Sequence, residues 1–130
     1  GLAVLKEILS KNLIDNAHIQ GITLKEKLNQ LKNEFSFIGD VRGKGLLMAF
    51  ELVSSKETME PLPTSMNADT LLVEEAYKKG LIIYSRKTRG GKIGDHFMIC
   101  PPLVINKKQI NEIYHILREC LKIIQSKLSL

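Results

Sequence analysis

Apolar residues recur every three or four positions at both ends of the chain, which is the spacing of one face of an α-helix. The pattern predicts a first helix to about Asn12, a second from about Ile14 to Glu34, and a last helix after the N-cap Asn106. Gly21 lies inside the second helix, where glycine costs about 1 kcal/mol relative to alanine, and we interpret it as the mark of a close helix crossing. The apolar stripe of the last helix predicts a core-facing surface formed by Ile110, Ile113, Tyr114, Leu117, Leu121, Ile124 and Leu128.

Between these helices, short apolar runs alternate with turn residues. Residues 38–45 contain three glycines and residues 46–53 are almost all apolar, so the two segments predict an antiparallel hairpin. Gly43 and Gly45 are expected where side chains would crowd the turn or the covering helix. Residues 54–66 contain two prolines and predict a loop.

The following segments predict a third helix and a second pair of strands. Asn67 or Asp69 is the expected N-cap of this helix, and a glycine near residue 80 ends it. Residues 81–85 and 96–100 predict strands, joined by a basic, glycine-rich loop at 86–94. The element order α-α-β-β-α-β-β-α predicts an α/β (α+β) domain of two layers, with about four mostly antiparallel strands and helices on one face.

The composition is typical of a soluble globular domain. The 130 residues are 44% hydrophobic and 25% charged, and no apolar run approaches the ~18–20 residues that a membrane span requires. We therefore expect a cytoplasmic protein that does not bind membranes. The chain begins without Met, already in helical register and without the cleavage site of a signal peptide, so we expect an excised piece of a larger protein.

Cysteine and histidine spacing predicts neither a disulfide nor a metal site. Cys100 and Cys120, the only two cysteines, are interpreted as small buried apolar residues in a reducing compartment. The three histidines lie far apart in the sequence. Asp95 and His96 are adjacent titratable residues that could orient a proton transfer, but an aspartate in a turn beside a histidine in a strand is more often structural.

The net charge of +5 comes in good part from residues 78–92. This basic segment has two interpretations: a solvated loop that keeps the protein soluble, or a surface that binds an anionic partner such as RNA. Nucleic-acid recognition favours several aromatic residues among the basic ones, and Tyr84 is the only one nearby. The pattern favours the solvated loop and predicts no nucleic-acid binding.

Three motifs, in this order and spacing, carry a resemblance to a known family. Val-Arg-Gly-Lys-Gly-Leu-Leu at 41–47 precedes a strand, Lys-Gly-Leu-Ile at 79–82 closes a helix, and Gly-Asp-His-Phe-Met-Ile-Cys-Pro-Pro-Leu-Val-Ile at 94–105 precedes the last helix. The chain resembles the C-terminal small domain of class III aminotransferases of the ornithine and ω-amino acid type, which are pyridoxal-phosphate enzymes of fold type I. The resemblance implies that residues 1–130 form one domain, and that two helices in residues 1–35 lead in from the large domain.

The resemblance implies an enzyme that transfers an amino group between an amino acid or ω-amine and a 2-oxo acid. Its cofactor is then pyridoxal 5'-phosphate, bound mainly by the large domain. No lysine here occupies the family's Schiff-base motif, so we expect no catalytic residue in this chain and no activity from the chain alone. The resemblance also implies a homodimer, since active sites of fold type I are built at the dimer interface.

The resemblance also suggests which residues could bind a substrate carboxylate, for which a guanidinium is well suited. In the ornithine and γ-aminobutyrate branches an arginine lies three residues before the first of two prolines, where this chain has Met98. Some relatives carry the arginine on the preceding loop instead. Arg89, and less well Arg86, are the candidates for that role, and the alternative is a solvent-exposed Arg89.

Five further residues are interpreted as structural or interface positions. Arg42 is expected to anchor the turn to backbone carbonyls or a carboxylate, or else to shape the site or a domain interface. Gly43 and Gly45 belong to the same turn. Pro101 and Pro102 are expected to fix the exit of the strand, with a cis bond possible there.

Overall fold

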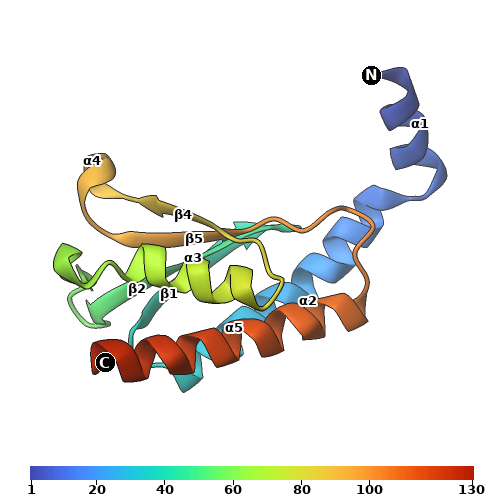
Figure 1. Cartoon of the computed structure of the whole chain (residues 1–130). Helices are drawn as coiled ribbons and strands as arrows, with labels where there is room; N and C mark the ends of the chain where they lie inside the picture. The colour runs from blue at the N-terminus through green and yellow to red at the C-terminus, as the bar shows by residue number, and fades with distance from the viewer.

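The chain folds as two layers, a sheet and a group of helices that covers one of its faces (Figure 1). The computed structural model describes the backbone of residues 1–130 and every side chain except that of Arg89. The elements in chain order are α1 (Leu2–Ser10), α2 (Leu13–Glu34), β1 (Ile38–Lys44), β2 (Leu47–Ser55), β3 (Glu60–Pro61), the 3-10 turn η1 (Thr64–Met66), α3 (Ala68–Lys78), β4 (Tyr84–Lys87), the short turn α4 (Arg89–Lys92), β5 (Asp95–Ile99) and α5 (Lys107–Leu128).

The sheet is antiparallel, with the strand order β1-β2-β5-β4 and the two-residue strand β3 attached to β2. Its register pairs Phe50 with Val41 on one side and with Phe97 on the other, and the rings of Phe50 and Phe97 stack with centroids 5.1 Å apart. Because side chains alternate between the faces of a strand, one face of the central strands holds the core residues Met48, Phe50, Leu52, Phe97 and Ile99. The predicted two-layer α/β fold is confirmed.

The long helices α2 and α5 bury one face each over the sheet. These faces are formed by Gly21, Leu24, Leu28 and Leu31 of α2 and by Ile110, Ile113, Leu117, Cys120, Leu121 and Ile124 of α5. Burying one such leucine or isoleucine contributes about 1.5–3 kcal/mol. The stripe predicted for the last helix is confirmed, with Tyr114 and Leu128 partly buried at its margins.

The start of α5 is capped as the sequence predicts. The side chain of Asn106 accepts a hydrogen bond from the backbone N–H of Gln109 at 3.0 Å. The side chain of Gln109 accepts one in return from the backbone N–H of Asn106 at 3.1 Å. This reciprocal pair is a capping box, which satisfies two backbone donors that the first turn of a helix leaves free.

Glycines allow the β1–β2 turn to pack closely. A Cβ on Gly21 would lie 2.7 Å from Gly45 Cα and closer still to its carbonyl oxygen, so the close approach at Gly21 is to the hairpin turn and not to another helix. Gly43 has φ +145°, and a Cβ there would lie 2.7 Å from the sulfur of Met48. Any side chain at Gly21 or Gly43 would therefore push two elements apart.

The second pair of strands begins later than predicted. β4 starts at Tyr84 and not at residue 81, because the N–H of Leu81 still bonds to the carbonyl of Ala76 at 2.9 Å and so belongs to the end of α3. Arg86 and Lys87 consequently lie in β4, whereas the sequence placed them in a loop. The loop itself is shorter and contains the turn α4.

The segment between β2 and α3 is more ordered than the predicted loop, since it contains β3 and η1. Of the two N-cap candidates predicted for α3, Asn67 is the N-cap. Its backbone has φ +47°, and its side chain makes no capping hydrogen bond. The other candidate, Asp69, instead forms an ion pair with Lys87 at 3.1 Å.

The first helix α1 projects from the end of α2, away from both layers (Figure 1). The structure describes all of α1 and buries none of its residues. Its apolar side chains Leu2, Val4, Leu5 and Leu9 are 68%, 63%, 52% and 66% exposed. The apolar side chains of α1 are therefore not part of the core of the described chain. Among the helices that the structure describes, none combines the length and apolar character that a membrane span needs.

Candidate functional site

The face of the sheet opposite the helices carries two rows of side chains that run across four strands. We call this surface the open face. By the register, one row is Arg42, Ala49, Met98 and Tyr84, and the next is Asp40, Glu51, His96 and Arg86. Three of the four members of the first row are apolar or aromatic, whereas all members of the second are polar. The open face therefore sets an apolar strip beside a charged one.

Arg42 is the centre of a polar cluster on the open face. Its Nη1 donates to Asp40 Oδ2 at 2.7 Å and to Glu51 Oε2 at 3.0 Å, and its Nη2 lies 2.6 Å from His96 Nδ1. The hydrogen bond from Arg42 lowers the pKa of the Asp40 carboxyl below its ordinary value, although partial burial works in the opposite direction. Three of the five guanidinium N–H donors of Arg42 are engaged within the chain, so the neighbours of Arg42 hold this side chain in place.

The contact with Arg42 fixes the state of His96. A guanidinium can only donate, so His96 Nδ1 accepts the hydrogen bond and the proton of the neutral ring lies on Nε2. Burial and the positive charge of Arg42 lower the pKa of His96, against a smaller opposing effect of Glu51. His96 is therefore an uncharged ring with one N–H donor at neutral pH.

Asp95 and His96 do not form the pair considered from the sequence, because they point to opposite faces of β5. His96 belongs to the open face, and Asp95 lies on the helix-covered side with 2% of its surface exposed. Lys87 Nζ contacts Asp95 Oδ1 at 2.9 Å and Asp69 Oδ1 at 3.1 Å. Burial raises the pKa of Asp95, although the bond from Lys87 opposes this. The Lys87 network joins α3 to the edge of the sheet.

The two arginines predicted to bind a carboxylate are placed differently. Arg86 is exposed on the open face beside His96, and it forms no ion pair with any side chain that the structure describes. Arg89 is the first residue of α4, and its side chain lies outside the described residues. Met98 lies in the apolar row between Ala49 and Tyr84. The sequence analysis did not predict that Arg86 and His96 are neighbours. The signal available in the sequence was the alternation of side chains between the two faces of β4 and β5.

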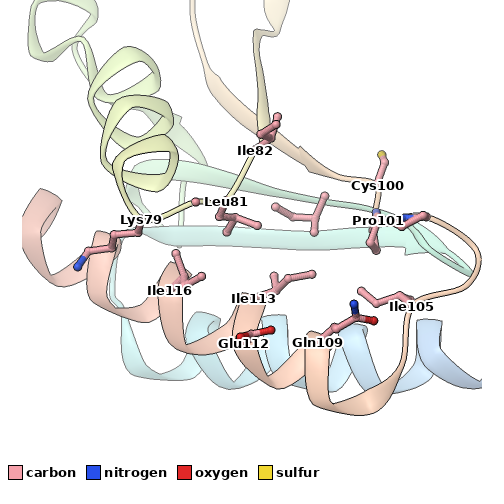
Figure 2. A pocket seen from close by; sticks show the side chains of 13 residues that line it. Lys79, Leu81, Ile82, Cys100, Pro101, Ile105, Gln109, Glu112, Ile113 and Ile116 are labelled. Carbon is pink, nitrogen blue, oxygen red and sulfur yellow. The ribbon is translucent and has the colours of Figure 1, made fainter.

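A hollow of about 560 Å³ lies on the helix side, at the end of β5 (Figure 2). Leu81, Ile105 and Ile113 point into it, and the exit of β5 at Pro101 and Pro102 forms one wall. The described backbone contains no cis peptide, so both proline bonds are trans. The polar groups of this hollow come from Lys79, Gln109 and Glu112.

Cys100 is exposed, which corrects the prediction of a buried cysteine. The strand β5 ends at Ile99, whose side chain is buried on the helix side. The next residue consequently points to the other side, where Figure 2 shows Cys100 and Ile82 projecting away from α5. Cys120 is buried in α5 as predicted, and both thiols are free.

The described residues do not fit pyridoxal phosphate. A phosphate needs several converging N–H donors or cations. In the hollow beside α5 the single cation, Lys79, is already paired with Glu119 at 3.1 Å, and Glu112 adds a negative charge. On the open face Arg42 is held by Asp40, Glu51 and His96, and the two carboxylates of this cluster oppose a phosphate. Within the described side chains there is also no group of three or more His, Cys, Asp or Glu residues that could hold a metal ion.

The basic residues of the 78–92 segment do not form one surface. Lys78, Lys79 and Lys87 each pair with a carboxylate. Lys78 ends α3, whereas Arg86 and Lys87 lie on opposite faces of β4. This distribution does not support the alternative of an RNA-binding loop.

Comparison with known proteins shows what the chain is similar to. A family model described as aminotransferase class-III matches residues 1–121. The chain is 35% identical to an uncharacterized aminotransferase of Bacillus subtilis over 98% of this chain, and 44% identical to an alanine–glyoxylate aminotransferase 2 homolog, mitochondrial, of Arabidopsis thaliana over 82%. A transaminase structure from the marine bacterium Virgibacillus matches with a TM-score of 0.91 and 28% identity, over 98% of this chain and 28% of that chain. The chain spans 29% and 21% of the length of the two curated relatives.

Proposed function

Since this chain belongs to the class III aminotransferases, we propose that it forms the C-terminal small domain of an enzyme that transfers an amino group between an amino acid or ω-amine and a 2-oxo acid. The observation that carries the proposal is that relatives match most of this chain, while the chain spans about a quarter of their length. Class III aminotransferases depend on pyridoxal phosphate, which supplies the electron sink for amino transfer when bound. We place the cofactor on residues outside this chain, because the described residues do not fit it.

Two exposed apolar surfaces support the proposal that this chain packs against another part of the protein. One is α1, whose side chains Leu2 and Leu9 are 68% and 66% exposed. The other is the apolar part of the open face and its border, where Leu47 and Tyr84 are 60% and 57% exposed. Extended exposed apolar patches usually mark interaction surfaces. We propose that the large domain covers both and that residues 1–35 lead in from it.

Two further properties belong to the same proposal. The enzyme is expected to be a homodimer, as the active sites of fold type I are built between subunits. We also propose a cytoplasmic location. It is supported by the free thiols of Cys100 and Cys120, since unpaired cysteines suit a reducing compartment.

The contribution of this chain is to cover the active site and to bind the substrate carboxylate. Arg86 supports this role because its guanidinium is exposed on the open face and carries no carboxylate partner among the described side chains. Arg89, which the sequence favoured over Arg86, is the other candidate. A guanidinium and a carboxylate can form two parallel charge-assisted hydrogen bonds, which fixes orientation as well as adding affinity.

The proposal is tested by comparing the full-length protein with the 130-residue chain. Amino transfer from several amino acids and ω-amines to 2-oxo acids is followed by mass spectrometry of the new amino acid. We expect activity in the full-length protein and none in the chain. Borohydride reduction after incubation with pyridoxal phosphate should label a lysine outside residues 1–130. A single stoichiometric label within this chain would contradict the assignment.

Kinetic measurements on the full-length enzyme distinguish Arg86 from Arg89 as the residue that binds the carboxylate. Arg86→Ala or Arg89→Ala should raise KM for the 2-oxo acid about tenfold or more, since a charge-assisted hydrogen bond contributes about 1.5–3 kcal/mol. Lys92→Ala, which removes a nearby exposed cation, is the matched control. An unchanged KM in both arginine variants would show that neither residue binds the carboxylate.

A further inference from the structure

The hollow beside α5 combines apolar walls with a carboxylate that has no partner among the described side chains (Figure 2). Its volume of about 560 Å³ lies within the range of about 300–1,000 Å³ that is typical of small-molecule pockets. We propose that this hollow binds a small organic ammonium ion, with the apolar body of the ligand against Leu81 and Ile113 and the charged nitrogen beside Glu112. Every group that carries this proposal lies on the described chain, so the proposal does not rest on the proposed function.

The hollow exists because two segments of the chain diverge above α5. The pairing of β4 with β5 ends at Tyr84 and Met98. On the side of β4, the N–H of Leu81 is hydrogen-bonded to the end of α3 and cannot extend the sheet. On the side of β5, Pro101 and Pro102 have no N–H to donate to a neighbouring strand. The sheet therefore stops short at this end, and α5 forms the floor of the space between the two segments.

Apolar side chains from separate segments form the walls. Leu81 and Ile113 point into the hollow from the two sides, and Ile105 closes it near the start of α5 (Figure 2). Ile113 and Ile116 are three residues apart, so they lie on one face of α5. Ile105 and Ile113 are buried at their other contacts, which holds the walls in place. These walls offer a ligand apolar contact and no hydrogen bond, so the ligand needs an apolar body.

The charges at the hollow favour a cation. Lys79 pairs with Glu119 at 3.1 Å, so these two charges compensate each other. Glu112 forms no ion pair with any side chain that the structure describes, and it leaves one negative charge at the hollow. The amide of Gln109 carries no charge, and its oxygen already accepts from the backbone N–H of Asn106. An ammonium ion would pair with Glu112, whereas a carboxylate or a phosphate would be repelled by it.

Binding is tested by methyl nuclear magnetic resonance on the 130-residue chain with three ligands of similar shape: cyclohexylmethylammonium, cyclohexylmethanol and cyclohexanecarboxylate. The ammonium ion should shift the signals of Leu81, Ile105 and Ile113. At low salt it should bind about fivefold more tightly than the alcohol, the upper range for one exposed ion pair, and the carboxylate should bind more weakly than the alcohol. Leu2 and Leu9 of α1, which are exposed, report non-specific apolar association. Equal shifts at Leu2 and Leu9, or an alcohol that binds as tightly as the ammonium ion, would overturn the proposal.

Variants of charged residues test the ion pair. Glu112→Gln should abolish the preference for the ammonium ion over the alcohol while the affinity for the alcohol stays the same. Glu26→Gln, which removes an exposed acid of α2 outside the hollow, is the matched control. Lys108 lies one turn before Glu112 and forms no ion pair with it, so Lys108→Gln should not weaken binding. A preference that survives Glu112→Gln would overturn the proposal.

Variants of apolar residues test the position of the ligand. Leu81→Trp places a larger side chain in the hollow and should weaken binding of the ammonium ion at least fivefold. Ile82→Trp is the control, because Ile82 projects away from α5 (Figure 2). Urea unfolding checks that each variant folds. Equal binding by folded Leu81→Trp and Ile82→Trp would place the ligand elsewhere, and Glu112→Gln keeps the proposal falsifiable if Leu81→Trp does not fold.

The full-length protein is tested with the N,N-dimethyl derivative of the same ammonium ion, because a tertiary amine cannot form an imine with an aldehyde cofactor. The derivative should shift the methyl signals of Ile105 and Ile113 as it does in the 130-residue chain. No shift at these isoleucines would mean that other parts of the protein fill the hollow, and the proposal would fail. Amino-transfer activity is not part of this readout, so the outcome is independent of the proposed function.

Discussion

Gly21 in α2 lies against the backbone of Gly45 in the β1–β2 turn, and a Cβ on Gly21 would be 2.7 Å from Gly45 Cα. The turn itself needs glycine, because Gly45 has φ +56° and Gly43 has φ +145°. The helix layer and the sheet therefore meet with backbone against backbone at this point. This contact joins α2 to the β1–β2 hairpin, whose first strand carries Arg42.

Gly21→Ala should destabilise the chain by about 2 kcal/mol. Alanine would gain up to about 1 kcal/mol of helix propensity, but its methyl group meets backbone atoms of Gly45, which cannot rotate away, and overpacking costs about 1–3 kcal/mol or more. Urea unfolding measures the difference. Lys25→Ala, at an exposed position of the same helix, should leave the midpoint nearly unchanged. A Gly21→Ala chain as stable as the original would show that the turn can shift at little cost.

Asn106→Ala should lower the free energy of unfolding by about 1 kcal/mol. The change removes the side-chain acceptor for Gln109 N–H, and lost N-caps cost about 0.5–2 kcal/mol. Gln109→Ala should cost less, since it removes only the reciprocal bond to the Asn106 backbone. Lys108→Ala, an exposed neighbour in the first turn, serves as the control. If all three variants unfold at the same urea concentration, the capping box contributes nothing measurable.

The helices are predicted well from the sequence because the apolar residues of each long helix recur with the helical period of about 3.6 residues. The stripe from Ile110 to Leu128 and the cap at Asn106 are examples. The second pair of strands is predicted less well. Residues 81–83 are as apolar as a strand, but the N–H of Leu81 is taken by Ala76 at the end of α3, a hydrogen bond that apolar patterning does not encode.

The site is less predictable because it depends on register. Arg42, Glu51, His96 and Arg86 belong to four different strands, and only the pairing of those strands makes them neighbours. The sequence singled out Arg42 and Arg86 separately but did not connect them through His96. Cys100 shows the same limit. Its sequence neighbours are apolar, but it follows Ile99, the last residue of β5, and so its side chain points to the exposed side instead of the helix side.

The ion pair between Asp40 and Arg42 should make the free energy of unfolding fall in acid. The bond from Arg42 lowers the pKa of Asp40 in the folded state below its ordinary value of 3.8, so the unfolded state binds the proton more tightly. The stabilisation is therefore fully present above the unfolded pKa and is lost as pH falls through the folded pKa. Asp40→Asn should reduce stability at neutral pH and flatten the decline below pH 3.8, measured by urea unfolding at several pH values. Glu57→Gln, an exposed acid, is the control. An unchanged acid slope in Asp40→Asn would contradict the coupling.

Lys87→Met should destabilise the chain by removing the cation from Asp95, whose surface is 2% exposed. We expect about 2–3 kcal/mol, below the roughly 3–5 kcal/mol for a fully buried pair, because the Lys87 side chain is 24% exposed. Burial already raises the pKa of Asp95, and losing Lys87 raises it further. The folded variant then binds a proton more tightly than the original folded chain. The deficit should therefore grow as pH rises through the raised folded-state pKa of Asp95 and shrink in acid.

A double variant separates the missing cation from the missing side chain of Lys87. Adding Asp95→Asn to Lys87→Met removes the unpaired buried carboxylate, so it should recover part of the lost stability and remove the extra loss of stability that Lys87→Met shows as pH rises. Lys92→Met, an exposed lysine of α4, should change neither quantity. Urea unfolding of the four chains across the acid range provides the test. A Lys87→Met deficit that is independent of pH, and that Asp95→Asn does not relieve, would mean that Lys87 stabilises the fold by packing and not by its charge.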